Sequence, residues 1–398
     1  MLVTKEKISD DDWKVLFKSN LFKNEVTIDF LSHQKNSNTN GQMEGEFFFK
    51  GLDLLKVKNL QYATDDILLS LDMYFNGSGD ISNIDLHQFI SANNNFKGNI
   101  KFLTSNKKEI KIRGYSFDFK DIPMQKEDNN STFIKVDIDI DNLLFGENNF
   151  GRAICNVDLY DEKIESLSGK LINNSIVHTN FVFREYDKKQ NDVIEFIFDD
   201  FGLFLKTVGV TDDFSNGKGI LTLTLKDDTQ EIINGFYDIK SFSIKNASFL
   251  ARILQLASFT GLLEILGNEG IPFSKLSGKF DKKNNVLKVN NTKFEGLSLG
   301  ATVKGSLNLE SKNIDLEGVL VPAYAINSII NKIPVIGDIV TGIEGEGIIG
   351  VEYKALGSFE NPNYLINPLS LFTPGILRNL FTPTDKKEDT EVNDDAKK

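Results

Sequence analysis

Apolar and polar residues alternate along most of this chain with a period of two residues. The clearest run alternates branched apolar side chains with charged ones: Ile134, Lys135, Val136, Asp137, Ile138, Asp139, Ile140, Asp141. A second run alternates leucine with threonine: Leu221, Thr222, Leu223, Thr224, Leu225. Because successive side chains of a β-strand point to opposite faces, the pattern predicts strands with one apolar face and one wet face.

Similar short runs recur from residue 46 to beyond residue 290, separated by polar clusters rich in Asn, Gly, Asp and Lys, such as residues 93–97 and 281–285. Such clusters are typical of hairpin turns. A packed two-sheet sandwich would cover every apolar face, whereas one long curled sheet would leave an apolar trough. The alternation does not separate these two arrangements, and on its own it favours the sandwich.

Three segments interrupt the alternation. Residues 248–266 predict a helix, whose apolar residues share one face at helical spacing: Leu250, Ile253, Leu254, Ala257, Gly261, Ile265. Residues 327–341 form a shorter apolar segment, broken by Pro334 and Gly337, and we expect short helices near the C-terminus. The charged residues 382–398 lack large apolar side chains apart from Val392, so we expect this tail to be disordered.

Composition narrows the function classes. The chain has 398 residues and is 40% hydrophobic, with 32 Phe against nine Tyr and one Trp. Phe supplies apolar area without a polar group, which suits contact with hydrocarbon. A net charge of −12 without a basic stripe argues against nucleic acid as a partner.

The sequence contains little evidence for a catalytic, nucleotide-binding or metal-binding motif. Residues 345–350 read Gly-Glu-Gly-Ile-Ile-Gly, but a strand pattern follows them, and a dinucleotide loop requires a helix there. Asp137, Asp139 and Asp141 imitate the start of a calcium loop whose later ligand positions fail. The three histidines and the single Cys155 show no catalytic or metal-ligating spacing. We therefore predict a non-catalytic protein without a metal or cofactor.

The second half of the chain contains several unusual sequence motifs in a fixed order. Residues 198–225 read FDDFGLFLKTVGVTDDFSNGKGILTLTL, and residues 246–280 hold the predicted helix followed by a Gly-Ile turn into strands. Residues 321–381 contain IPVIGD, a later NP, and the closing NPLS and PGILRNLF. This order resembles the C-terminal region of AsmA-like envelope proteins, specifically the YhdP-type branch. Residues 1–189 resemble the preceding repetitive region more loosely, with KIRGYSFDF at 111–119 the best local match.

The resemblance implies a repeating β-groove on the periplasmic side of the cell envelope, which handles phospholipid acyl chains between inner and outer membranes. We accordingly predict a mainly β fold, an elongated curved antiparallel sheet. Its expected parts are a repetitive region 1–189, an AsmA-like domain 190–381 and the tail 382–398. A structural scaffold without a lipid conduit, and an envelope hydrolase with a clustered polar pocket, remain as alternatives.

Apolar positions in the strands, the helix and the C-terminal segment are candidate contacts with lipid or with a membrane. The expected lipid contacts are Ile134, Val136, Ile138, Ile140, Leu221, Leu223, Leu225, Leu250, Ile253, Leu254 and Ile265. The expected contacts with a membrane or membrane protein are Leu371, Phe372, Ile376, Leu377, Leu380 and Phe381. Family members begin with an inner-membrane helix, whereas MLVTKEKISDDDWK has no apolar core of a signal peptide. We therefore expect this chain to be the downstream part of a longer protein.

Overall fold

Most of the chain is placed in a single large sheet. A computed structural model describes residues 1–28, 33–118, 132–146, 148–161, 163–185, 191–226, 229–245, 248–256, 263–264, 270–322, 351–359 and 361–367. Among these residues, 22 strands form one sheet and two further strands form a small one. The prediction of a mainly β fold is confirmed.

The first half of the chain supplies strands β1 to β12. Their bounds are β1 (Leu2–Lys7), β2 (Asp12–Asn20), β3 (Val26–Ile28), β4 (His33–Lys35), β5 (Gly41–Lys50), β6 (Asp53–Thr64), β7 (Leu68–Phe75), β8 (Ile81–Ile90), β9 (Asn95–Thr104), β10 (Lys107–Asp118), β11 (Phe133–Phe145) and β12 (Asn148–Asn149). Strands β3 and β4 pair only with each other among the described residues.

The second half supplies the other strands and two short helices. The strands are β13 (Arg152–Tyr160), β14 (Lys163–Asn173), β15 (Ile176–Arg184), β16 (Val193–Phe198), β17 (Phe214–Leu225), β18 (Ile232–Ile244), β19 (Ile271–Lys283), β20 (Val286–Glu295), β21 (Leu299–Asn308), β22 (Asn313–Pro322), β23 (Val351–Ser358) and β24 (Asn363–Asn367). The helices are α1 (Phe201–Thr207) and α2 (Ser248–Leu256).

Most strands that follow one another in the sequence are neighbours in the sheet. Two exceptions in the large sheet are β2, which pairs with β5, and β13, which pairs with β11. The pairs are antiparallel with one exception among the described strands: β10 and β11 are parallel. The predicted antiparallel sheet thus contains one parallel pair among the described strands. A parallel pair needs a crossover between its strands, and residues 119–131 of that connection lie outside the described residues.

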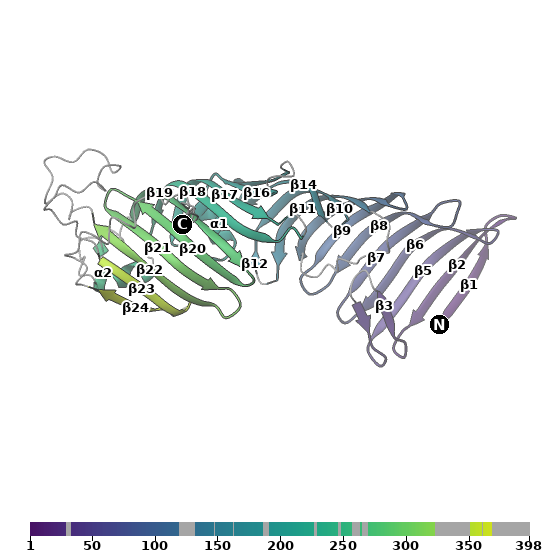
Figure 1. The fold of residues 1–398 in the computed structure, drawn as a ribbon. Helices are drawn as coiled ribbons and strands as arrows, with labels where there is room; N and C mark the ends of the chain where they lie inside the picture. The colour runs from purple at the N-terminus through teal and green to yellow at the C-terminus, as the bar shows by residue number, and fades with distance from the viewer. Residues whose placement is uncertain are drawn as a thin grey trace, which may run out of the picture.

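The sheet is long and curled, with β1 at one end and β24 at the other (Figure 1). No second large sheet covers it among the described residues. The structure therefore decides between the two arrangements that the alternation left open, in favour of the open sheet. The boundary expected between residues 189 and 190 falls between β15 and β16, which pair directly.

Glycines on the apolar face make room for large side chains on the next strand. Phe181 lies over Gly169, and Phe280 lies over Gly235. A side-chain carbon added at Gly169 would collide with the Phe181 ring and would lie 2.5 Å from Cys155 Cβ and 2.8 Å from the Ile154 carbonyl oxygen. Glycine at such places lets a sheet bend toward its packed face.

We predict that Gly169→Ala lowers the free energy of unfolding by about 1–3 kcal/mol, because the added methyl group overpacks the sheet. Gly77→Ala is the matched control, since nothing lies within 4 Å of the added carbon there. Urea unfolding followed by circular dichroism measures both variants. Equal stabilities for the two variants would contradict this account of the bend.

Candidate functional site

One apolar face runs across the first half of the sheet without a break. Side chains directly opposite each other on paired strands lie on the same face. The register joins one apolar residue of each strand to the next, from β2 to β14: Val15, Phe47, Val57, Met73, Ile84, Ile100, Ile110, Val136, Val157, Leu167. We call this set, with its continuation below, the apolar row.

The apolar row continues through the second half. Its residues from β16 to β24 are Ile194, Leu223, Gly235, Phe280, Val289, Gly305, Leu316, Ala355 and Tyr364. Ile194 pairs with Phe183 on β15, and Phe181 on the same strand pairs with Gly169, two residues from Leu167. The parallel pair β10–β11 preserves the row because Ile110 stands opposite Val136.

Burial changes along several strands of the apolar face, as β11 and β13 show. On β11, Ile134 and Val136 keep part of their surface exposed, whereas Ile138 and Ile140 are 1% and 0% exposed. On β13, Val157 and Leu159 are likewise partly exposed. On these two strands one side of the face is filled by the chain's own side chains, and a strip beside it, which holds Val136 and Val157, is partly exposed.

The filled side is deepest in the second half, where both helices pack on the sheet. Leu250, Ile253 and Leu254 of α2 belong to one buried cluster with strand residues Phe198, Ile239, Phe242, Ile244, Ile271, Phe273, Leu276, Leu299, Leu320 and Val351. Helix α1 adds Phe201 and Phe204 to the edge of this cluster. The carboxylate of Asp200 caps α1 by accepting a hydrogen bond from the Leu203 amide at 2.9 Å.

The expected lipid contacts therefore fall into two groups by exposure. Ile134, Val136, Leu221 and Leu223 are partly exposed on the apolar face. The other described candidates are buried by the chain itself: Ile138, Ile140, Leu225, Leu250, Ile253, Leu254. Helix α2 is described over Ser248–Leu256, and the rest of the expected helix, except residues 263–264, lies outside the described residues with Ile265.

Other predictions also fall outside the described part of the chain. They concern the apolar segment 327–341, the tail 382–398 and the expected docking residues Leu371, Phe372, Ile376, Leu377, Leu380 and Phe381. Sequence reasoning missed the aromatic share of the apolar face, which includes Phe47, Phe181, Phe196 and Phe280. The high Phe content signalled it, but only the strand register places these rings on one face.

The opposite face carries charge in matched pairs between neighbouring strands. Arg113 contacts Asp137 at 2.6 Å, and Arg152 contacts Asp139 at 3.0 Å. Lys275 pairs with Asp238 at 3.0 Å in the second half. The acidic residues that imitate a calcium loop are therefore alternating positions of a strand, two of them paired with arginine.

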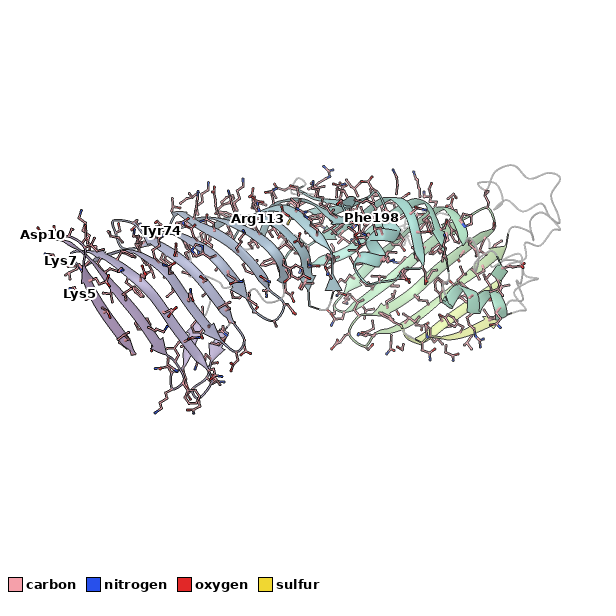
Figure 2. All side chains as sticks on the ribbon, turned by 180° about the vertical axis from the view of Figure 1, so that it is seen from behind. Lys5, Lys7, Asp10, Tyr74, Arg113 and Phe198 are labelled. Atoms are coloured by element: carbon pink, nitrogen blue, oxygen red, sulfur yellow. The ribbon has the colours of Figure 1, made fainter. Side chains whose placement is uncertain are left out.

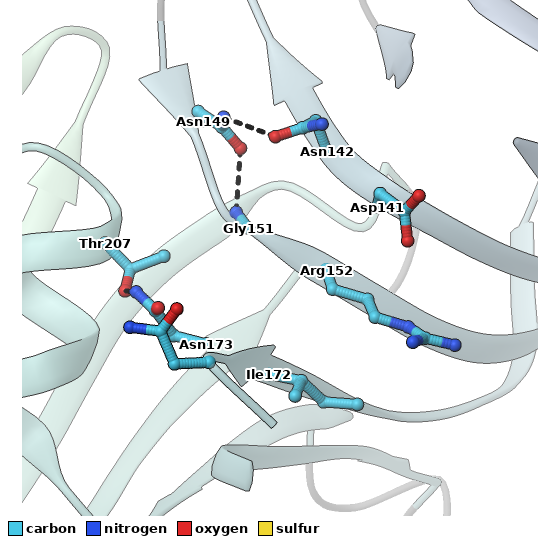
Figure 3. A pocket seen from close by; sticks show the side chains of 9 residues that line it. Asp141, Asn142, Asn149, Gly151, Arg152, Ile172, Asn173 and Thr207 are labelled. Carbon is cyan, nitrogen blue, oxygen red and sulfur yellow. Dashed lines mark hydrogen bonds between the residues drawn. The ribbon is translucent and has the colours of Figure 1, made fainter. Parts of the chain in front are cut away.

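A polar pocket of about 320 Å³ lies where β11, β13 and β14 meet the end of α1 (Figure 3). Polar groups of the pocket form hydrogen bonds with one another. Asn149 donates to Asn142 Oδ1 at 3.1 Å and accepts from the Gly151 amide at 2.8 Å (Figure 3). Asn173 donates to Thr207 Oγ1 at 2.8 Å. These bonds tie β14 to α1 and give the pocket a structural role.

Nucleophile and metal chemistry find little support in the described residues. Burial raises the pKa of the Cys155 thiol to about 11, so this thiol stays protonated at neutral pH. No three His, Cys, Asp or Glu side chains are placed to share a metal ion within the described part of the chain. None of its helices is long and apolar enough to cross a membrane.

His178 is fully buried beside α1. Its Nδ1 lies 2.9 Å from Thr179 Oγ1, and its ring centre lies 6.3 Å from that of Phe204. Its Nε2 has no hydrogen-bond partner among the described residues. Burial lowers the pKa of this imidazole, against the opposing influence of the Asp200 carboxylate. The folded chain therefore favours a neutral His178.

Comparison with known proteins agrees with this geometry. The family model described as YhdP protein matches residues 6–364, which is most of the chain. The chain belongs to the YhdP family. The match covers both halves of the sheet and crosses the boundary expected at residue 189. The first half of the chain, whose resemblance to the family was looser, is therefore also part of the family match. No curated protein and no solved structure matches the chain.

We predict that Leu254→Ala lowers the free energy of unfolding by about 2–5 kcal/mol, because it leaves a cavity between α2 and the sheet. Leu254 is 0% exposed, whereas Phe249 on the same helix is 43% exposed. Phe249→Ala is therefore the control, with an expected loss within about 0.5 kcal/mol. Thermal unfolding of both variants measures the difference, and a harmless Leu254→Ala would show that α2 does not seal this end.

We predict that His178 weakens the fold in acid. The unfolded chain takes up a proton near the ordinary pKa of 6.5, and the folded chain does so only at lower pH. Stability contributed by neutral His178 is thus complete above pH 6.5 and falls as the pH drops below it, by up to about 1.4 kcal/mol per pH unit. Urea unfolding of wild type and His178→Gln from pH 8 to pH 5 should show a difference that shrinks in acid; a constant difference would contradict the prediction.

Proposed function

We propose that this chain holds phospholipid acyl chains on the partly exposed strip of its apolar face, and so contributes to lipid movement between the inner and outer membranes of the cell envelope. The observation that supports this proposal most is the apolar row, whose residues lie opposite one another on paired strands from β2 to β24. Membership of the YhdP family and a large open sheet both fit an envelope lipid-transport protein.

Energetics favour such a path. Each CH₂ exposed to water costs about 0.8 kcal/mol, so a 16-carbon chain would meet a barrier on the order of 12 kcal/mol in water. An apolar surface that continues from strand to strand lowers this barrier without breaking a covalent bond. No catalytic group is needed for that role.

The buried cluster around α2 favours a second candidate for the last strands. There the apolar face is covered by Leu250, Ile253 and Leu254, as a structural scaffold requires. The two functions differ over the first half of the sheet, where Ile100, Ile110 and Val136 are partly exposed. A scaffold leaves those residues in water, and a lipid-binding protein covers them with hydrocarbon.

Photo-crosslinking separates the two. A photoreactive phenylalanine analogue at Ile100 or Val136 should capture phospholipid in cells, because both positions lie on the apolar face. The same analogue at Lys101 or Lys135, the neighbouring exposed positions on the other face, should not. Mass spectrometry of the purified adducts identifies the lipid. Capture that is absent, or equal on both faces, would favour the scaffold.

A further inference from the structure

Two lysines of the first strand lie on the apolar face. In the register of β1 with β2, Val3 stands opposite Phe17, Lys5 opposite Val15, and Lys7 opposite Trp13. Lys5 and Lys7 therefore lie on the same face as the apolar row, at the end of the sheet where β1 has no further strand beside it among the described residues (Figure 2). Every residue of β1 is exposed.

Trp13 is held firmly beneath these lysines. Its ring stacks on Phe49 with centroids 4.2 Å apart, and its Nε1 donates a hydrogen bond to the Gly51 carbonyl oxygen at 2.6 Å. Lys5 Nζ lies 4.0 Å above the centre of the Trp13 ring. The arrangement places an ammonium group over an amphipathic aromatic ring, beside Val15 of the apolar row.

The positive charges of Lys5 and Lys7 have few acidic partners among the described residues. Lys5 makes no ion pair among the described residues, and Lys7 contacts only Asp10, whose side chain is fully exposed. Such an exposed pair contributes little free energy. On the other face of the same strands the lysines are matched, since Lys14 contacts Glu6 at 3.0 Å and Lys18 contacts Glu44 at 2.6 Å.

We propose that Lys5 and Lys7 bind the phosphate of a phospholipid headgroup whose acyl chains lie on the apolar row from Val15 and Phe47 onward. The inference rests on the proposed function and adds its headgroup chemistry. Lysine binds phosphate as a compact point charge. Trp favours the boundary between headgroups and hydrocarbon, because its ring is apolar and its N–H is polar.

Trp13 supplies the assay, because it is the only Trp of the chain and its fluorescence reports this end of the sheet. The whole chain is titrated with phosphatidylglycerol carrying brominated acyl chains, which quench Trp emission on contact. Diacylglycerol with the same brominated chains lacks the phosphate. Wild type should be half-quenched at about tenfold less phosphatidylglycerol than diacylglycerol, a ratio that corresponds to 1.4 kcal/mol.

The double variant Lys5→Gln, Lys7→Gln should lose this tenfold preference while still being quenched by diacylglycerol. Lys18→Gln, Lys101→Gln is the charge-matched control, since both residues are exposed on the opposite face, and it should keep the preference. A preference that survives in the Lys5, Lys7 variant overturns the proposal. Wild type without a preference also overturns it, while crosslinking at Ile100 and Val136 tests the proposed function independently.

Two further arms identify the source of the phosphate. Inorganic phosphate that abolishes quenching by phosphatidylglycerol at equal concentration would show a site for free phosphate and overturn the headgroup assignment. Cosedimentation with intact phosphatidylglycerol vesicles tests docking to a membrane surface. Sedimentation that depends on Lys5 and Lys7, with an unchanged lipid preference in the quenching assay, would overturn the proposal in favour of surface docking.

Discussion

The alignment of apolar side chains across hydrogen-bonded strands is the constraint on which the rest of this structure depends. Side chains alternate strictly along a strand, so a register shift of one residue would move a strand's whole apolar set to the wet face. Cross-strand ion pairs such as Arg113–Asp137 and Lys275–Asp238 stand on the wet face and favour the observed register. The apolar row persists even at the parallel pair β10–β11, where Ile110 meets Val136.

The apolar face is buried in one part and partly exposed in another. Around α2, Leu250, Ile253 and Leu254 complete a buried cluster and give the last strands an ordinary protein core. Beside it, partly exposed residues such as Val136 and Leu223 have no second layer of large sheet over them among the described residues. Under the proposed function, stability and lipid contact fall on different strips of one sheet.

Charge follows the division of the faces. The wet face carries matched pairs, whereas Lys5 and Lys7 stand on the apolar face at β1 without a buried partner. A cation next to an apolar surface suits a molecule with an anionic head and a hydrocarbon tail. The net charge of −12 gives no hint of this, since it sums over both faces.

Periodicity alone determined the strands, because alternation is a local property: residues 134–140 form part of a strand with their apolar side chains on one face, as predicted. The sequence motifs of the second half and their order indicated the family. Only the tertiary structure decided which apolar residues stay partly exposed, since Val136 and Ile138 look alike in sequence and differ in burial. Burial depends on the side chains that pack from distant strands and helices. The contact of Lys5 with Trp13 likewise depends on the register of β1 with β2, which a turn connects.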